Sequence, residues 1–180
     1  STIKSLINMK DEFVVNKIGK VKVIAPNGDS VCFNLKNANF VVDREKFDNY
    51  IADLAKKEGA RYFFNKKFET FDGSEIKFSD CEVRKTNFLV GADGPMSKVA
   101  KDSGMYYNRK FMTGMQARVK GKFDSGMFIV YLGEGYFGWC VPENEEVSRV
   151  GVIVAREKPN EYFNDVLKRV NGELIEHQSG

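Results

Sequence analysis

The sequence predicts an α+β (α/β-like) protein whose first part is mixed and whose second part is an antiparallel sheet. Alternating apolar residues on both sides of the segment 26–29 (PNGD) indicate a β-hairpin. Apolar residues recur at intervals of three and four between Arg44 and Glu58, as they do in an amphipathic helix. Between Met112 and Ala155, strand-like segments alternate with glycine turns, which favours antiparallel pairing.

The composition is that of an ordinary globular protein, with 42% hydrophobic and 29% charged residues among 180. The longest apolar run, Met127–Leu132, is far shorter than the ~20 residues that span a bilayer. A net charge of +3 is too small to indicate nucleic-acid binding. The single histidine, His177, excludes most catalysis built on histidine and any histidine-rich metal site, so we expect no metal.

Cysteine usage and the start of the chain bear on location. Cys32, Cys81 and Cys140 lie far apart without a CxxC pair, which fits a reducing compartment. The first residues, Ser1–Ser5, contain no apolar segment typical of a signal peptide. We therefore expect a cytoplasmic protein, and the missing initial methionine suggests that the chain is an internal piece of a longer product.

The first part of the chain is expected to place strands around one helix. After the hairpin, a short strand at 40–42 ends at Asp43, a good N-cap for the helix that begins at Arg44. Gly59 is expected to end this helix in a left-handed conformation. Further strands are then expected, in the segments 60–64, 67–71, 75–83 and 87–90.

The second part is expected to contain four strands and a final helix that opens at Pro159. The strands are expected at 114–119, 126–132, 136–141 and 147–155. The segment 133–138 matches GxGxxG, but a strand rather than a helix follows it. A dinucleotide site needs a helix N-terminus there, so the glycines indicate a hairpin turn.

The segment after the expected strand 87–90 carries candidate binding chemistry. Gly91–Gly94 (GADG) leaves the carboxylate of Asp93 at the end of a strand and before a short helix from Pro95 to Ser103. Ligands of open α/β sheets bind at this place, and a carboxylate there can accept hydrogen bonds from ribose or ribityl hydroxyls. Gly94 allows close backbone approach. The alternative is a turn that caps the helix.

Asp43–Asp48 (DREKFD), the pair Gly59-Ala60 and Gly91–Lys101 (GADGPMSKVAK) together resemble the FAD-dependent oxidoreductases of the aromatic-hydroxylase superfamily. The last segment is most similar to the geranylgeranyl reductase family, because ring hydroxylases usually have arginine in place of Ala100. The resemblance covers roughly residues 15 to 175. It implies an FAD/NAD(P)-binding flavoprotein fold with an antiparallel substrate-domain sheet.

The resemblance also implies a division of the chain. A partial FAD-binding domain would occupy residues 1–110, and an antiparallel substrate-binding domain would occupy residues 111–180. Nothing before Lys20 resembles the glycine fingerprint with which the superfamily begins. Because backbone amides of that fingerprint hold the phosphates, this chain by itself is expected to bind FAD poorly and to be inactive.

Four cofactor contacts are implied by the resemblance. Arg44 would lie near the FAD diphosphate or ribityl chain, where a guanidinium can bind phosphate with two hydrogen bonds. Asp93 and Gly94 would lie beside the ribose–phosphate part, and Phe68 would offer backbone to the adenine. The alternative for Arg44 is a surface salt bridge to Asp48, four residues on.

Tyr136–Pro142 (YFGWCVP) resembles the Y-x-W-x-F-P segment with which family reductases line a lipid cavity over the flavin. The chain keeps Trp139 and Pro142 and has Phe137 and Val141 in place of the family's tyrosine and phenylalanine. On a strand, Phe137, Trp139 and Val141 share one face. They either wall an isoprenoid tunnel or fill a core. Flavin-dependent halogenases have a similar W-x-W-x-I-P segment.

The implied activity is an FAD-dependent oxidoreductase of lipid biosynthesis that reduces isoprenoid double bonds of a prenyl (geranylgeranyl) lipid. Reduced flavin would supply a hydride, and an acid or water would supply a proton. The sequence assigns no catalytic residue, no electron donor (reduced nicotinamide or ferredoxin) and no oligomeric state. The lipid substrate suggests peripheral association with a membrane. The alternatives are a flavin-dependent monooxygenase or halogenase, and a non-catalytic lipid-binding module.

Overall fold

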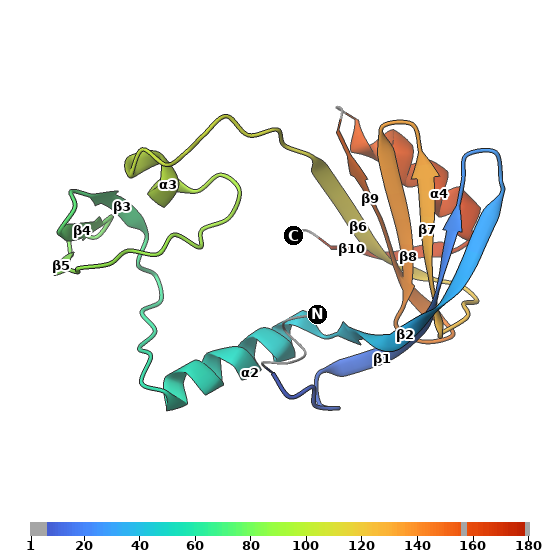
Figure 1. Ribbon diagram of the computed structural model, residues 1–180, viewed down its shortest axis with the longest axis horizontal. Coiled ribbons are helices and arrows are strands. Elements are labelled where there is room, and N and C mark those ends of the chain that lie inside the picture. The colour runs from blue at the N-terminus through green and yellow to red at the C-terminus, as the bar shows by residue number, and fades with distance from the viewer. Residues whose placement is uncertain (1–6, 156–157, 179–180) are drawn as a thin grey trace. The chain divides into compact units, whose positions relative to one another are not determined.

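The computed structural model describes residues 7–155 and 158–178, which form two compact units (Figure 1). The sheet unit comprises residues 1–53 and 111–180, and the small unit comprises residues 54–110. Each unit is described by itself. The mixed α/β architecture with a mostly antiparallel sheet confirms the predicted fold class.

The sheet unit is built on a seven-stranded sheet in the order β10-β6-β9-β8-β7-β1-β2. All neighbouring strands run antiparallel except β1 and β7, which are parallel. The strands are β1 (Val14–Ile24), β2 (Ser30–Val42), β6 (Thr113–Lys120), β7 (Met127–Gly133), β8 (Tyr136–Pro142), β9 (Val147–Val154) and β10 (Glu173–Gln178).

The predicted hairpin and the four predicted strands of the second part are confirmed. The expected short strand at 40–42 is instead the end of the thirteen-residue β2. The segment 133–138 contains the predicted hairpin turn, in which Gly133 pairs with Tyr136 and Gly135 has a φ of 79°. β10 was not predicted, because its sequence is mostly polar and it lies exposed at the sheet edge.

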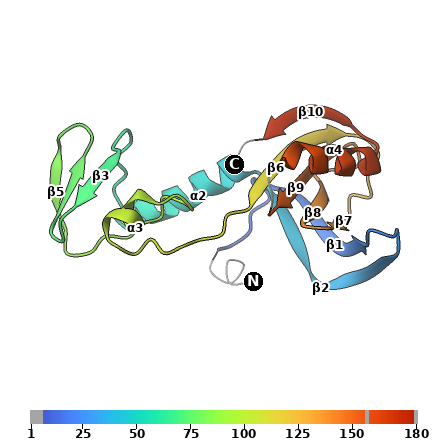
Figure 2. The ribbon, with the colours of Figure 1, turned by 90° about the horizontal axis from the view of Figure 1, so that it is seen from above.

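One face of the sheet is covered by α4 (Pro159–Val170), the helix predicted to open at Pro159. Figure 2 shows α4 against the sheet, where it contacts β6, β8 and β9. Phe163 and Val166 of the helix are buried with the apolar side chains of these strands. Gly138 permits this close approach, because a Cβ there would lie 2.5 Å from Val166 Cγ2. This packing forms the main core.

The helix α2 (Arg44–Lys57) begins directly after β2. Asp43 caps it as predicted, since the Lys46 amide donates to the Asp43 carboxylate at 3.2 Å. Phe47 anchors the first turns, with its ring 5.2 Å from that of Phe13 in an edge-to-face arrangement. Gly59 follows the helix with a φ of 95°, in the left-handed conformation expected there.

The small unit contains the three-stranded antiparallel sheet β3 (Phe68–Phe71), β4 (Glu75–Phe78) and β5 (Val83–Lys85), and the helix α3 (Lys98–Asp102). The expected strand at 75–83 is divided by a turn in which Cys81 has a φ of 66°. α3 begins at Lys98 rather than at Pro95, because Ser97 caps it.

The strands expected at 60–64 and 87–90 are not formed, so these predictions were wrong. Their apolar side chains are exposed, Phe88 by 88% and Val90 by 85%. Neither segment pairs with a neighbouring strand within the described residues. An apolar run becomes a strand only where a partner strand accepts its backbone hydrogen bonds.

The expected division into residues 1–110 and 111–180 differs from the compact units. The boundary after residue 110 falls at the same place. The hairpin of β1 and β2, however, belongs to the same sheet as β6–β10. No described helix is long and apolar enough to span a bilayer.

Candidate functional site

The face of the sheet opposite α4 carries the predicted tryptophan. Along β8, buried residues alternate with partly exposed ones. Phe137, Trp139 and Val141 share the open face, as their spacing predicts, and Phe137 is 42% exposed. Pro142 points to the other face, where it is buried. The structure therefore brings three of the four predicted substrate residues together and separates Pro142 from them.

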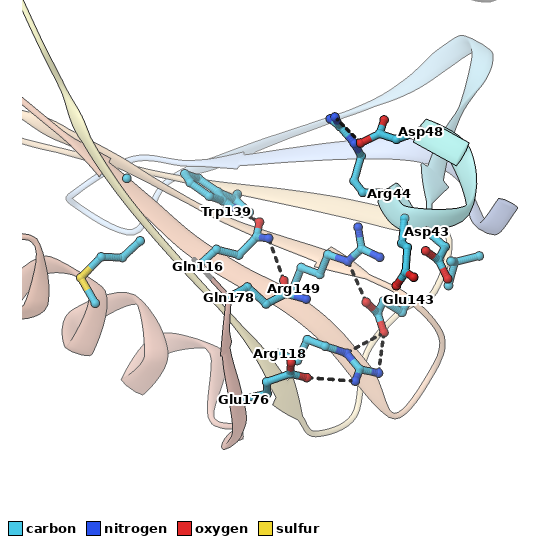
Figure 3. Close-up of a pocket in the computed structure, with 14 residues that line it drawn as sticks. Asp43, Arg44, Asp48, Gln116, Arg118, Trp139, Glu143, Arg149, Glu176 and Gln178 are labelled. Atoms are coloured by element: carbon cyan, nitrogen blue, oxygen red, sulfur yellow. Dashed lines mark hydrogen bonds and ion pairs between the residues drawn. The ribbon is translucent and has the colours of Figure 1, made fainter. Parts of the chain in front are cut away.

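The indole of Trp139 is held by a chain of amides (Figure 3). Trp139 Nε1 donates to Gln116 Oε1 at 3.0 Å, and Gln116 Nε2 donates to Gln178 Oε1 at 2.8 Å. The ring lies over Gly151, where a Cβ would come within 2.3 Å of Trp139 Cζ2. These contacts fix the orientation of the ring on the open face.

A buried carboxylate organises the charged end of this face. Glu143, whose side chain is 8% exposed, accepts hydrogen bonds from Arg149 Nε at 2.7 Å and Arg118 Nη2 at 2.9 Å. Burial raises the pKa of Glu143, but the hydrogen bonds and charges of the two arginines outweigh it, so the net pKa is lowered. Arg149 Nη1 also donates to the Val42 carbonyl at 3.0 Å, which ties β9 to the end of β2.

These side chains and the start of α2 line a pocket of about 1040 Å³ (Figure 3). Five carboxylates and three guanidinium groups surround it, so it offers no net positive charge to an anion. Gln116, Gln178 and the indole supply neutral hydrogen-bonding groups beside an apolar ring. The arrangement suits a ligand with an uncharged polar part and an apolar part.

Arg44 lines this pocket from the first position of α2. Its Nη2 atom is 3.1 Å from Asp48 Oδ2, so the alternative salt bridge is present in the structure. The arginine side chain is 74% exposed. Exposed pairs of this kind are worth only about 0–1 kcal/mol. Arg44 can therefore leave Asp48 at little cost.

Asp93 and Gly94 lie in the small unit, at the start of α3. The Asp93 carboxylate accepts hydrogen bonds from Ser97 Oγ at 2.5 Å, the Lys98 amide at 2.7 Å and the Val99 amide at 3.1 Å. The hydrogen bond from Ser97 is the largest cause of the lowered pKa of Asp93, followed by that from Val99. The capping alternative is therefore what the structure shows, and Gly94 supplies the turn with a φ of 82°.

Phe68 also lies in the small unit, half-buried at the start of β3, where it pairs with Phe78 of β4. Among the predicted residues, Arg44 and Trp139 thus line one pocket, while Phe68, Asp93 and Gly94 belong to the other unit.

Sequence reasoning missed the polar residues that surround Trp139. A signal was present: Gln116 and Arg118 lie two apart in an otherwise apolar strand, and such spacing places both on one face. Their partners Arg149 and Gln178 come from other strands, and Glu143 comes from the turn between β8 and β9. No local pattern joins these residues, because strand pairing alone brings them together.

His177 does not belong to this site. It pairs with the buried Ala117, and its ring lies 6.2 Å from that of Phe163 on α4. Histidine therefore supplies no proton donor to the Trp139 face. Among residues 7–155 and 158–178, no cluster of three potential metal ligands occurs.

Comparison with known proteins gives relatives in sequence and in structure, although no family model matches. The chain is 25% identical to a digeranylgeranylglycerophospholipid reductase of Methanococcus vannielii over 185 residues, covering 89% of this chain and 46% of that protein. It is 23% identical to a chloroplastic geranylgeranyl diphosphate reductase of Arabidopsis thaliana, covering 78% of this chain and 36% of the relative.

This chain is similar in sequence to the geranylgeranyl reductases. The predicted resemblance is thereby confirmed. The chain spans about half the length of these reductases or less. A geranylgeranyl bacteriochlorophyll reductase-like protein of Thermoplasma acidophilum has the same fold, with a TM-score of 0.78, 20% identity and coverage of 98% of this chain and 52% of its own.

The fold is shared more widely than among the geranylgeranyl reductases. A flavin-dependent brominase matches with a TM-score of 0.71 at 16% identity, covering 98% of this chain and 54% of the brominase. At such identities the likeness shows the fold alone. The sequence relatives, rather than the fold, therefore favour the reductases.

Proposed function

We propose that this chain is part of an FAD-dependent oxidoreductase that reduces isoprenoid double bonds of a prenyl lipid. The observation that carries the proposal is the open face of β8, where Phe137, Trp139 and Val141 present apolar surface beside a polar pocket. An amphiphile with an unsaturated chain matches this surface. The printed names of the sequence relatives describe reductases of geranylgeranyl lipids.

The residues present fit part of an FAD molecule. Arg44 lines the pocket, is 74% exposed and pairs with Asp48, so its guanidinium can reach a phosphate or ribityl oxygen. Asp93 is exposed, so its carboxylate can be reached by a ribityl hydroxyl although Ser97, Lys98 and Val99 already donate to it. The Lys98, Val99 and Ala100 amides already donate to Asp93 or Ser97 and are not available to phosphate.

The protein's part in the reaction is to bind the lipid, to orient its double bond and to exclude water from it. Reduced FAD supplies a hydride to the alkene when bound, and a proton from an acid or from water completes the addition of hydrogen. The Gln116–Gln178 chain holds the Trp139 ring still, so that an alkene packed on it has a fixed position. Apolar neighbours such as Phe137 keep water from the bound isoprenoid chain. On the open face, no described histidine acts as the proton donor.

The remaining parts of the proposal concern partners. The protein works in the cytoplasm beside the membrane that holds its lipid. A flavin-dependent monooxygenase or halogenase has support from the fold alone. The acid-rich pocket and the flanking apolar strand favour an amphiphile over a flat aromatic substrate.

Photo-crosslinking tests the substrate class. A geranylgeranyl analogue with a diazirine on its chain is irradiated with the protein, and the labelled peptide is found by mass spectrometry. We expect label in residues 136–142, displaced by unlabelled geranylgeraniol and not by indole. Displacement by indole at the same concentration, or label spread over the α4 face, would count against a prenyl-lipid reductase.

A further inference from the structure

The open face changes polarity at one boundary between strands. Strand pairing lines up Gln178, Gln116, Gly151 and Trp139 in a row that crosses β10, β6, β9 and β8. A parallel row contains Glu176, Arg118, Arg149 and Val141. Polar side chains occupy β10 and β6 in the first row, where β9 contributes Gly151, and β10, β6 and β9 in the second; in both rows the apolar side chains begin at β8.

Beyond β8, two neighbouring rows contain apolar residues only. Trp139 pairs with Val130 of β7, which is beside Val23 of β1 and then Val31 of β2. On β7, β1 and β2, the neighbouring row of paired residues is Phe128, Val21 and Phe33, of which Val21 is nearly buried. Val31 is 65% exposed and Phe33 is 46% exposed, at the far edge of the sheet. Figure 1 shows β8, β7 and the hairpin side by side.

The width of the apolar half of the open face, from β8 to β2, matches a long isoprenoid chain and not a short one. Neighbouring strands lie about 4.8 Å apart, so β2 is about 14 Å from β8. At about 1.2 Å per bond, a geranylgeranyl chain of roughly fifteen bonds extends about 18 Å, and a geranyl chain of roughly seven bonds about 8 Å. A C20 chain that starts at Trp139 passes β2, whereas a C10 chain ends before β1.

We propose that the lipid lies across the strands, its polar end beside Gln116 and Gln178 and its chain running over β7 and β1 to Val31 and Phe33. This inference rests on the proposed function and extends it. The β1–β2 hairpin then acts as a chain-length determinant, far along the sequence from Trp139. The apolar rows, exposed at Val31 and Phe33, and their polar border both fit an isoprenoid alcohol or a neutral headgroup.

Binding of geraniol and geranylgeraniol to the full 180-residue chain tests this placement. Trp139 is the only tryptophan, so its fluorescence reports the occupied face. The variants Phe33→Thr and Val31→Thr keep good strand formers while removing apolar contact. Cys32→Thr is the matched control, because Cys32 is exposed on the same strand and points to the other face. Circular dichroism verifies that each variant is folded.

We expect Phe33→Thr to weaken geranylgeraniol binding about tenfold, the effect of exposing roughly two methylene groups. Geraniol binding should stay unchanged, and Val31→Thr should act in the same direction. Cys32→Thr should leave both affinities as they are. Weaker binding of geranylgeraniol with unchanged binding of geraniol is a result that general damage to the fold does not produce.

Other outcomes overturn the placement. Equal weakening of both alcohols, or none for geranylgeraniol, would show that the chain does not reach β2. A dimer that dissociates in Phe33→Thr and Val31→Thr would show that a second copy covers this edge. If neither alcohol binds the unaltered chain, the proposed function itself fails. This outcome is distinct from a failure of the placement, which only the variants reveal.

Discussion

Glu143 is the residue on which the charged end of the site depends. It is nearly buried, and the two arginines that surround it would otherwise repel each other across adjacent strands. Arg149 in turn holds the last carbonyl of β2, immediately before Asp43 and Arg44. The position of the predicted cofactor residue therefore depends on a carboxylate that comes from the β8–β9 turn.

Glu143→Gln should destabilise the protein by about 2 kcal/mol near neutral pH, the typical value of a hydrogen bond to a charged group. The folded-state pKa of Glu143 is lowered from 4.5, so its stabilising effect is present above pH 4.5 and lost as pH falls through the folded-state pKa. Urea unfolding of both proteins at several pH values measures this difference. The difference should shrink in acid.

The matched control is Glu176→Gln. Glu176 is more than half exposed and lies 3.5 Å from Arg118, so its loss should change the free energy of unfolding by less than about 0.5 kcal/mol. A stability difference for Glu143→Gln that is constant from neutral to acid pH would mean that its charge contributes nothing.

At the scale of elements, the close approach of α4 to β8 separates the two faces of the sheet. Gly138 lies between Phe137 and Trp139 and points toward Val166. Because no side chain stands between strand and helix here, α4 packs closely on its own face. The open face is left for Trp139 and its neighbours.

Gly138→Ala should therefore destabilise the protein by about 1–3 kcal/mol, since the added methyl would overlap Val166. Thermal unfolding measures the effect. The double variant Gly138→Ala/Val166→Ala should lose less stability than the two single variants lose together. The smaller side chain at position 166 leaves room for the methyl group added at position 138. Gly114→Ala, whose Cβ would lie 3.7 Å from the nearest atom, should be nearly neutral. Strict additivity of the two losses would contradict the packing.

Elements with local signals could be predicted from the sequence, and those that depend on distant partners could not. The helix from Arg44 and the turn at 133–138 have their causes nearby, in an N-cap, an apolar period and glycines. The segment 87–90 has an equally apolar sequence and forms no strand. β10 is polar and forms one, because the edge of β6 accepts its hydrogen bonds.

The same distinction applies to the candidate site. Alternation along β8 was enough to place Phe137, Trp139 and Val141 on one face. Gln116 and Gln178 come from β6 and β10, so their contact with the indole could not be predicted from any segment alone. For Asp93, the sequence left capping and ligand binding open; the three hydrogen bonds at α3 show capping, and ligand binding stays a proposal.

At the scale of the whole molecule, the decisive feature is the parallel pairing of β1 with β7. It joins segments about one hundred residues apart and carries the hairpin into the second-part sheet. Without it, the open face would end at β7, and the apolar rows would stop short of β2. No local pattern predicts such a pairing, so the sequence alone could not assign residues 14–42 to this sheet.

Fluorescence of Trp139 during separate titrations with geranylgeraniol and with FAD tests the central claim, that the open face binds a prenyl lipid. We predict a saturable change with the lipid and none with FAD, because the indole lies on the proposed lipid face and the α3 amides that could hold phosphate are already occupied. No saturable change with the lipid would contradict the claim and leave Trp139 as a structural residue of the sheet.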